Sequence, residues 1–83
     1  MIYLDERRTE YIQTLTEYLP LLRARIRISQ EDLARGVGIS RQTYSLIETG
    51  KQNMTWVTFM AIIAFFANNE KTRKELQRLG LID

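Results

Sequence analysis

The sequence predicts an all-α protein, a compact bundle of five or six short helices. Apolar residues recur at steps of three and four, which is the spacing of one face of a helix. No segment of useful length alternates apolar and polar residues with the period of two that a half-buried strand requires. Capping residues and glycines stand where helices would begin and end.

The first helical stripe contains a proline. Its apolar residues are Ile12, Leu15, Leu19, Leu22 and Ile26. Pro20 lies inside the stripe, where its ring removes a backbone hydrogen bond and crowds the carbonyl four residues earlier. We therefore expect a helix near 5–18 followed by one near 20–26, either joined through a kink or separated by a break.

The second helix has signals at both ends. Ser29 followed by Asp32 resembles a capping box, with serine as the N-cap and an acid in the first turn. Gly38 can adopt the left-handed conformation that ends many helices. These residues predict a helix that runs from about Gln30 to about Val37.

Two further helices follow in the same manner. Ser40 is the expected N-cap of a helix to about Thr49, and Gly50 ends it. Thr55 is the expected N-cap of a helix over 56–67. The apolar stripe of that helix is Phe59, Ile62, Ile63 and Phe66.

The last helix is expected to start at Asn68 or Asn69 and to carry Leu76 and Leu79. A chain of 83 residues can hold one compact core. We therefore expect a single domain over 1–83, with an N-terminal extension helix at 1–18, a central core at 20–67, and a C-terminal helix and tail at 69–83.

The composition argues against several classes of protein. There are no cysteines and no histidines, which removes thiolate chemistry, the usual general base and the commonest metal ligand. The acids are scattered over predicted helix surfaces, and no glycine-rich phosphate loop is present. We expect no enzymatic activity, no metal and no cofactor.

No apolar run reaches the length of about 18 residues that a membrane span needs, so we expect a cytoplasmic protein without a membrane segment. The net charge is only +2, but residues 23–51 contain six bases and three acids. A basic segment with amides and an aromatic residue is a weak indication of nucleic-acid binding, since most charge clusters are simply solvated.

Residues 30–49 fit two helices that cross at a tight turn. Ala34 is a small residue where the second helix would pass over the first, and Gly38 tolerates the turn. The residues expected to face inward are Leu33, Val37, Ile39, Tyr44 and Ile47. This spacing predicts a helix-turn-helix.

The segment resembles the Cro/repressor (Xre-type) family. Three segments are close to the family's usual sequence motifs: 28–34 (ISQEDLA), 38–45 (GISRQTYS) and 47–51 (IETGK). Thr55 lies where the fourth helix of the family is usually capped. The resemblance covers residues 20–67 and implies a lambda-repressor-like DNA-binding domain. The chain departs from the family pattern at Arg27, Gly36, Leu46 and Met54.

The resemblance, with the outward face of the third helix, gives a set of candidate DNA contacts. Arg41 and Gln42 stand at the start of the recognition helix, where arginine can bind guanine and glutamine can bind adenine in the major groove. Gln30 opens the preceding helix, whose N-terminus can bind a phosphate. The other candidates are Ser40, Thr43, Ser45, Lys51, Gln52 and Asn53. Ser40 and Thr43 could equally serve only as helix-start hydrogen bonds, and the loop 51–53 could simply be solvated.

The resemblance also implies a structural pair between Arg23 and Glu48, which would orient the recognition helix without touching DNA. The expected function is sequence-specific binding of double-stranded DNA by a transcription regulator, a repressor that reads the major groove with helix 40–49. Two alternatives are an antitoxin-type protein that also binds a protein toxin, and a pure protein-interaction domain.

A single helix-turn-helix reads only a few base pairs, so we expect a homodimer. The apolar residues that suggest an interface are Leu76, Leu79, Leu81 and Ile82 near the C-terminus, with Ile2, Tyr3 and Leu4 as a second cluster. The competing interpretation is that both ends of the chain fold over the core.

Overall fold

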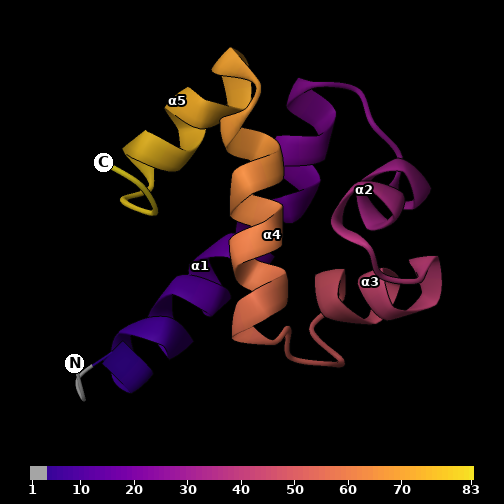
Figure 1. The fold of residues 1–83 in the computed structure, drawn as a ribbon, viewed down its shortest axis with the longest axis horizontal. Coiled ribbons are helices and arrows are strands. Elements are labelled where there is room, and N and C mark those ends of the chain that lie inside the picture. The colour runs from indigo at the N-terminus through magenta and orange to yellow at the C-terminus, as the bar shows by residue number, and fades with distance from the viewer. Residues whose placement is uncertain (1–3) are drawn as a thin grey trace.

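The computed structural model describes the backbone of residues 4–83 and the side chains of residues 7–83. Within this part of the chain the secondary structure is entirely helical (Figure 1). The helices are α1 (Leu4–Arg25), α2 (Gln30–Val37), α3 (Arg41–Glu48), α4 (Trp56–Ala67) and α5 (Glu70–Arg78). The predicted all-α bundle with a helix-turn-helix is confirmed.

The first helix is longer than expected. Of the two alternatives for Pro20, the structure has the uninterrupted one, and α1 continues through it for 22 residues. Pro20 itself is exposed, so the backbone group left unpaired by the missing N–H lies near solvent. The buried stripe of Leu15, Leu19 and Leu22 runs past the proline and holds both halves of α1 on the same core.

The predicted caps form as hydrogen bonds. The Ser29 hydroxyl accepts from the backbone N–H of Asp32 at 3.0 Å, and the Asp32 carboxylate accepts from the N–H of Ser29 at 3.3 Å. This reciprocal pair is the capping box of α2. The N-caps of α3, α4 and α5 are Ser40, Thr55 and Asn69. Gly38, with φ of 82°, ends α2 in the left-handed conformation.

One departure from the family pattern lies at Arg27, in the turn from α1 to α2. It has φ of 56°, and it is the one residue other than glycine with a positive φ in the described part of the chain. The turn from α1 to α2 therefore requires the left-handed conformation that glycine adopts most easily. The chain places an arginine there.

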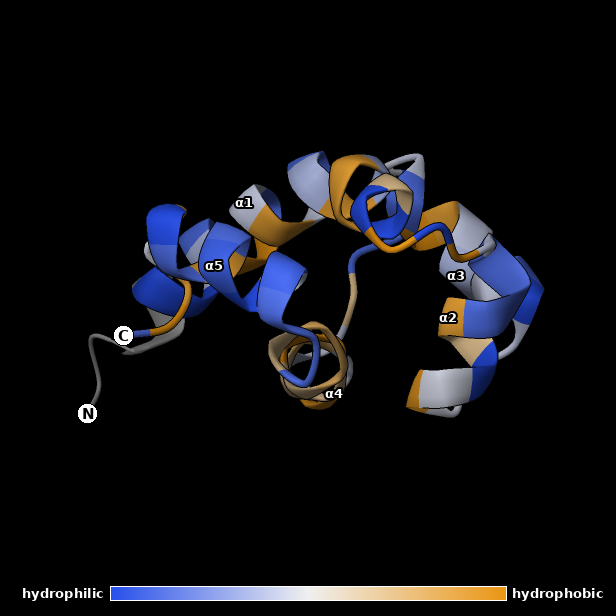
Figure 2. Ribbon diagram, turned by 90° about the horizontal axis from the view of Figure 1, so that it is seen from above, coloured by the Kyte–Doolittle hydropathy of each residue, from blue (hydrophilic) through white to orange (hydrophobic). Residues whose placement is uncertain are grey.

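The core forms where α1 and α4 meet the other helices. Its buried residues are Leu15, Leu19, Leu22, Leu33, Ala34, Tyr44, Ile47, Met54, Phe59, Ile62, Phe66 and Leu76. In Figure 1, α4 stands between α2 and α3 on one side and α5 on the other, and it contacts α1, α2 and α5. Figure 2 looks along α4 and shows that its ribbon is coloured as hydrophobic.

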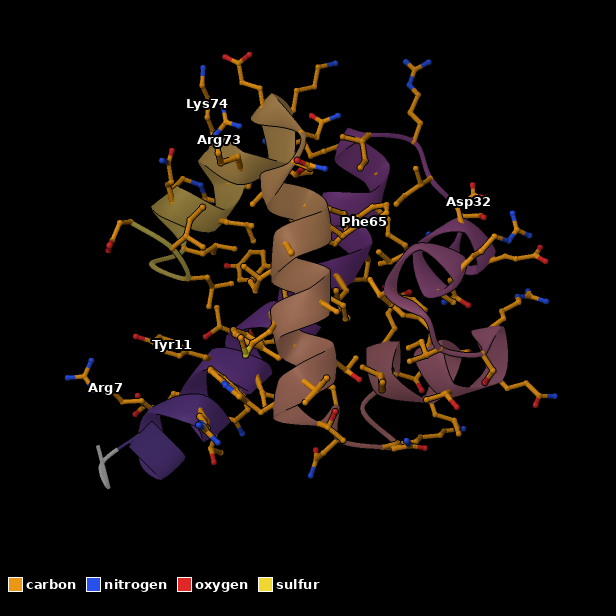
Figure 3. The ribbon with its side chains drawn as sticks, in the orientation of Figure 1. Arg7, Tyr11, Asp32, Phe65, Arg73 and Lys74 are labelled. Atoms are coloured by element: carbon orange, nitrogen blue, oxygen red, sulfur yellow. The ribbon has the colours of Figure 1, made fainter. Side chains whose placement is uncertain are left out.

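Gly36 explains a second departure, because α2 and α4 approach closely at this residue. A Cβ atom at Gly36 would lie 2.5 Å from Cε2 of Phe65, closer than such atoms come in proteins. Figure 3 shows Phe65 on the side of α4 that faces α2. Any larger residue at this position would require the Phe65 ring to move, so glycine allows this close approach of the two helices.

The C-terminal end folds back onto the core. Leu76 is fully buried, and Leu81 and Ile82 pack against the core while Leu79 is half-buried. The expectation that these residues form a free apolar interface is therefore wrong for Leu76, because the core is large enough to take it. Ile2, Tyr3 and the side chain of Leu4 lie outside the described residues. Within those residues, no helix combines the length and the apolar character needed to cross a membrane.

Candidate nucleic-acid interface

A carboxylate–guanidinium pair joins α1 to α3. Nε and Nη2 of Arg23 each donate to one carboxylate oxygen of Glu48, and both distances are 2.9 Å. Nη1 of Arg23 also donates to the carbonyl of Ile28 at 3.2 Å, which ties the pair to the turn before α2. The side chain of Arg23 is 20% exposed and that of Glu48 is 10% exposed. The implied pair forms as a bidentate, partly buried contact.

Two further side chains bind the same carboxylate. The hydroxyl of Tyr44 donates to Oε1 of Glu48 at 2.5 Å, and Nε2 of Gln30 donates to Oε2 at 3.0 Å. Glu48 therefore holds residues from α1, α2 and α3 together. Sequence analysis missed both bonds. The spacing of four between Tyr44 and Glu48 places them on one helix face and could have indicated the first.

These contacts shift the ionisation of the groups involved. Burial by itself would raise the pKa of Glu48, but the hydrogen bonds from Arg23, Tyr44 and Gln30 outweigh it and lower the pKa below its usual 4.5. The bond to Glu48 raises the pKa of Arg23. Burial, followed by the bond to Glu48, raises the pKa of Tyr44. The carboxylate is thus charged and the phenol neutral over the whole neutral range.

The start of α3 and the start of α2 share a small hollow. Its volume is about 190 Å³, and it is lined by Gln30, Arg41, Gln42 and Ser45. Arg41 and Gln42 are exposed, and Arg41 has no ion pair within the described part of the chain. Four predicted contact residues therefore come together on one surface. Nε2 of Gln30 gives one of its two hydrogens to Glu48, so the second N–H and the carbonyl oxygen are left for a ligand.

Ser40 and Thr43 act as the cap of α3. Oγ of Ser40 accepts from the backbone N–H of Thr43 at 3.0 Å and donates to Oγ1 of Thr43 at 2.9 Å. Of the two interpretations of these residues, the structure contains the helix-start hydrogen bonds. A phosphate contact would compete with, or add to, these bonds.

The loop after α3 lies apart from this hollow. The N–H groups of Lys51 and Gln52 both donate to the carbonyl of Leu46, at 2.9 and 3.2 Å, so the loop folds back on the end of α3. Lys51, Gln52 and Asn53 are exposed, and Asn53 lines a different hollow beside α1. Leu46, on α3, is 41% exposed, an apolar side chain that sequence analysis had not counted as a contact.

The comparison with protein families agrees with this geometry. A family model described as a helix-turn-helix domain matches residues 14–76, which contain the whole of α2 to α4 and most of α1 and α5. No curated protein and no solved structure matches the chain. The matched span is well over half of the 83 residues, and the chain belongs to the helix-turn-helix family of DNA-binding domains.

Proposed function

We propose that this protein is a sequence-specific transcription regulator of the Cro/repressor type, which inserts α3 into the major groove of double-stranded DNA. The observation that carries the proposal is the hollow in which Gln30, Arg41, Gln42 and Ser45 meet. Side chains at the N-terminal end of a recognition helix are the ones that reach base edges. The Glu48 contacts support the proposal because they fix the angle of α3 against α1 and α2.

Each side chain has a role that follows from its chemistry. Arg41 can donate to O6 and N7 of guanine, and Gln42 can bind adenine through N6 and N7. The exposed apolar side chain of Leu46 suits the methyl group of thymine. Gln30, held by Glu48, is positioned to accept a hydrogen bond through its carbonyl oxygen. Ser45 lies one turn further along α3, and its short side chain would reach a base only if α3 lies deep in the groove.

The loop at Lys51, Gln52 and Asn53 would bind the phosphate backbone rather than the bases. Its side chains are polar or basic and exposed, and its own backbone is anchored on the carbonyl of Leu46. Phosphate contacts set the register of a protein on DNA and supply much of its affinity, without selecting a sequence. A phosphate contact from Ser40 or Thr43 would either replace or add to the cap bonds of these residues.

The form of the protein that binds a complete DNA site would be a homodimer, with two recognition helices about 34 Å apart on successive turns of DNA. A two-fold interface needs a self-complementary surface, and we place it on the outer side of α4. Val57 is 77% exposed and Met60 is 55% exposed, and α4 carries no charged residue that would repel its own copy. We therefore move the proposed interface from the C-terminal end to α4.

The deciding experiment is selection of bound sequences from a random pool of duplexes at a stated salt concentration. The expected result is a palindromic site whose half-sites contain the bases read by Arg41 and Gln42. Duplex binding without any enriched sequence would contradict sequence-specific regulation. An absence of binding even at low salt would favour the protein-interaction domain. An antitoxin would bind DNA and also a toxin, and none of the described contacts favours that role.

A further inference from the structure

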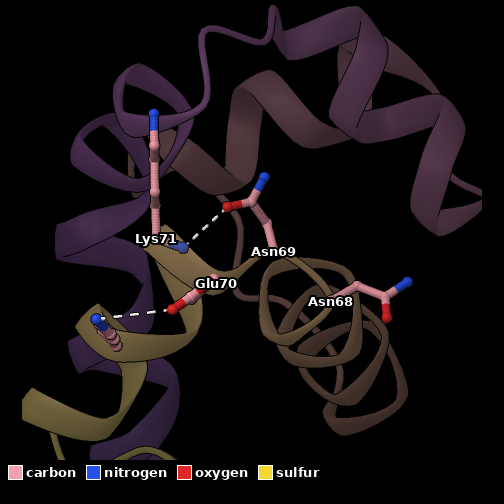
Figure 4. Close-up of a pocket in the computed structure, with 5 residues that line it drawn as sticks. Asn68, Asn69, Glu70 and Lys71 are labelled. Atoms are coloured by element: carbon pink, nitrogen blue, oxygen red, sulfur yellow. Dashed lines mark hydrogen bonds and ion pairs between the residues drawn. The ribbon is translucent and has the colours of Figure 1, made fainter.

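A second hollow lies between the end of α1 and the start of α5. Its volume is about 190 Å³, and it is lined by Arg25, Ile26, Arg27, Asn69 and Lys71. Three of these side chains are cationic, and none is a carboxylate. We name this the basic hollow. A wider hollow of about 560 Å³ adjoins it at Lys71, but its lining includes the carboxylate of Glu70 (Figure 4).

Two of the three cations in the basic hollow are unpaired. Arg25 donates to Glu75 at 3.1 Å, so its charge is partly neutralised. The side chains of Arg27 and Lys71 have no hydrogen bond or ion pair to any described residue. In Figure 4 the side chain of Lys71 extends away from the ion pair between Glu70 and Lys74, whose N···O distance is 3.8 Å. The hollow therefore presents uncompensated positive charge.

The backbone at Arg27 gives a second, independent observation. Its φ of 56° is a conformation that a residue with a side chain adopts only at a cost, and glycine would avoid that cost. The arginine side chain makes no hydrogen bond or ion pair to a described residue that would offset this cost. The turn that ends α1 would accept glycine here, so the arginine is the residue that adds a cation beside Lys71.

The basic hollow lies near the N-terminus of α2, although it shares no lining residue with the hollow at Arg41. Arg27 precedes Ser29, the N-cap of α2, and Gln30, the first residue of α2, already lines the hollow beside Arg41. Figure 1 shows the end of α1, the turn to α2 and the start of α5 at the same edge of the molecule. Because Arg27 is two residues before the N-cap of α2, a phosphate bound near that N-terminus would lie within reach of the basic hollow.

We propose that the basic hollow binds a backbone phosphate of the DNA, outside the groove that α3 reads. The inference rests on the proposed function and extends its contact surface from the helix-turn-helix to α5. A phosphate suits the site because it is a compact anion that an arginine can bind bidentately and a lysine as a point charge. Such a contact would add affinity and salt dependence without adding base preference.

The test compares salt dependence among matched variants. Fluorescence anisotropy with a random-sequence duplex gives the slope of log K against log salt for the parent, R27G, K71Q, the double variant and K74Q. Each change in the hollow should lower the slope by about 1, and the double variant by about 2. K74Q removes the same charge from a lysine that is paired with Glu70 and outside the hollow, so its slope should match the parent's. R27G relieves a strained backbone and should fold at least as well as the parent.

Three results would overturn the inference. If the parent binds duplex and the double variant keeps its slope, the basic hollow is not a DNA site while the proposed function stands. If K74Q lowers the slope as much as K71Q, the effect is one of general charge. If inorganic phosphate shifts the NMR signals of Arg27 and Lys71 and the duplex does not, the hollow takes a free anion instead. A parent that binds no duplex at low salt removes the proposed function itself.

Discussion

The carboxylate of Glu48 accepts four hydrogen bonds, from Arg23, Gln30 and Tyr44. Replacing Glu48 with alanine would leave the Arg23 guanidinium partly buried and without its partner. We expect Glu48→Ala to reduce the free energy of unfolding at pH 7 by up to about 3–5 kcal/mol, the cost of a fully buried charge that loses its partner, since Arg23 is 20% exposed. Urea unfolding followed by circular dichroism measures this change.

The same residue gives a pH dependence. In the folded state the pKa of Glu48 is below its usual 4.5. The stabilisation that its carboxylate provides is therefore complete above pH 4.5, and it is lost as the pH falls through the lower pKa of the folded state. The difference between the parent and Glu48→Ala should therefore shrink below pH 4.5. Glu31→Ala is the control, because its exposed pair with Arg35 should contribute no more than about 0.5 kcal/mol. Equal losses in the two variants would show that the Glu48 contacts are solvated.

A substitution at Arg27 is expected to increase the stability of the protein, in contrast to Glu48→Ala. Arg27→Gly should stabilise the fold by about 0.5–1 kcal/mol, because relief of the left-handed strain exceeds the entropy that glycine adds to the unfolded chain. Arg27→Ala is the matched control. It removes the same side-chain charge but keeps the Cβ, so it should bring no gain. Thermal unfolding of both variants tests this, and a gain in Arg27→Ala equal to that in Arg27→Gly would mean that charge, not backbone conformation, is responsible.

Arg41 and Gln42 should determine which bases are chosen. We expect Arg41→Ala and Gln42→Ala each to weaken specific binding by about 1–3 kcal/mol and to relax the preference at particular positions. Lys51→Ala provides the contrast, because a phosphate contact should weaken binding to all duplexes alike and lower the salt slope by about 1. Binding titrations on the selected site and on single-base variants separate the two effects. Unaltered base preference in both α3 variants would contradict the proposed docking.

At the scale of elements, the contact between α2 and α4 depends on Gly36. Glycine to alanine inside an exposed helix normally stabilises it by about 1 kcal/mol. Here the new Cβ would lie 2.5 Å from Phe65, so Gly36→Ala should instead destabilise the protein by about 1–3 kcal/mol. Chemical denaturation of Gly36→Ala, Phe65→Leu and the double variant measures the coupling. The penalty should be smaller in the Phe65→Leu background, and strictly additive losses would exclude this contact as the cause.

The outer side of α4 makes a prediction about assembly, at the scale of the whole molecule. Met60→Glu should give a monomer, because two copies would bring like charges into an apolar interface. The fold should survive, since Met60 is 55% exposed. Leu21→Glu is the control, because it places the same charge at an exposed apolar residue of another helix, α1, where Leu21 is 40% exposed. Sedimentation analysis decides between the outcomes, and a parent that is monomeric at tens of micromolar, on the scale of weak protein association, would exclude the dimer.

The bounds of the helices were largely predictable because they depend on local bonds. Ser29, Ser40 and Thr55 cap the helices that their positions predicted, through hydrogen bonds to residues three positions further along. Gly38 likewise ends α2 through its own backbone conformation. The pair of Arg23 and Glu48 was also foreseen, since it came with the family resemblance. The sequence left open whether the first helix continues or breaks at Pro20, and the structure has the continuous helix, because the buried leucines on both sides outweigh the loss of one backbone bond.

The sequence by itself determined the fold class and the position of the helix-turn-helix, because helical spacing and capping act over three or four residues. Tertiary structure alone decided that Gln30 binds Glu48, that α2 meets α4 at Gly36, and that Leu76 enters the core. It also brought Arg27 beside Lys71 in the basic hollow. These contacts join residues far apart in the chain, and their formation depends on how the helices pack, which no local pattern specifies.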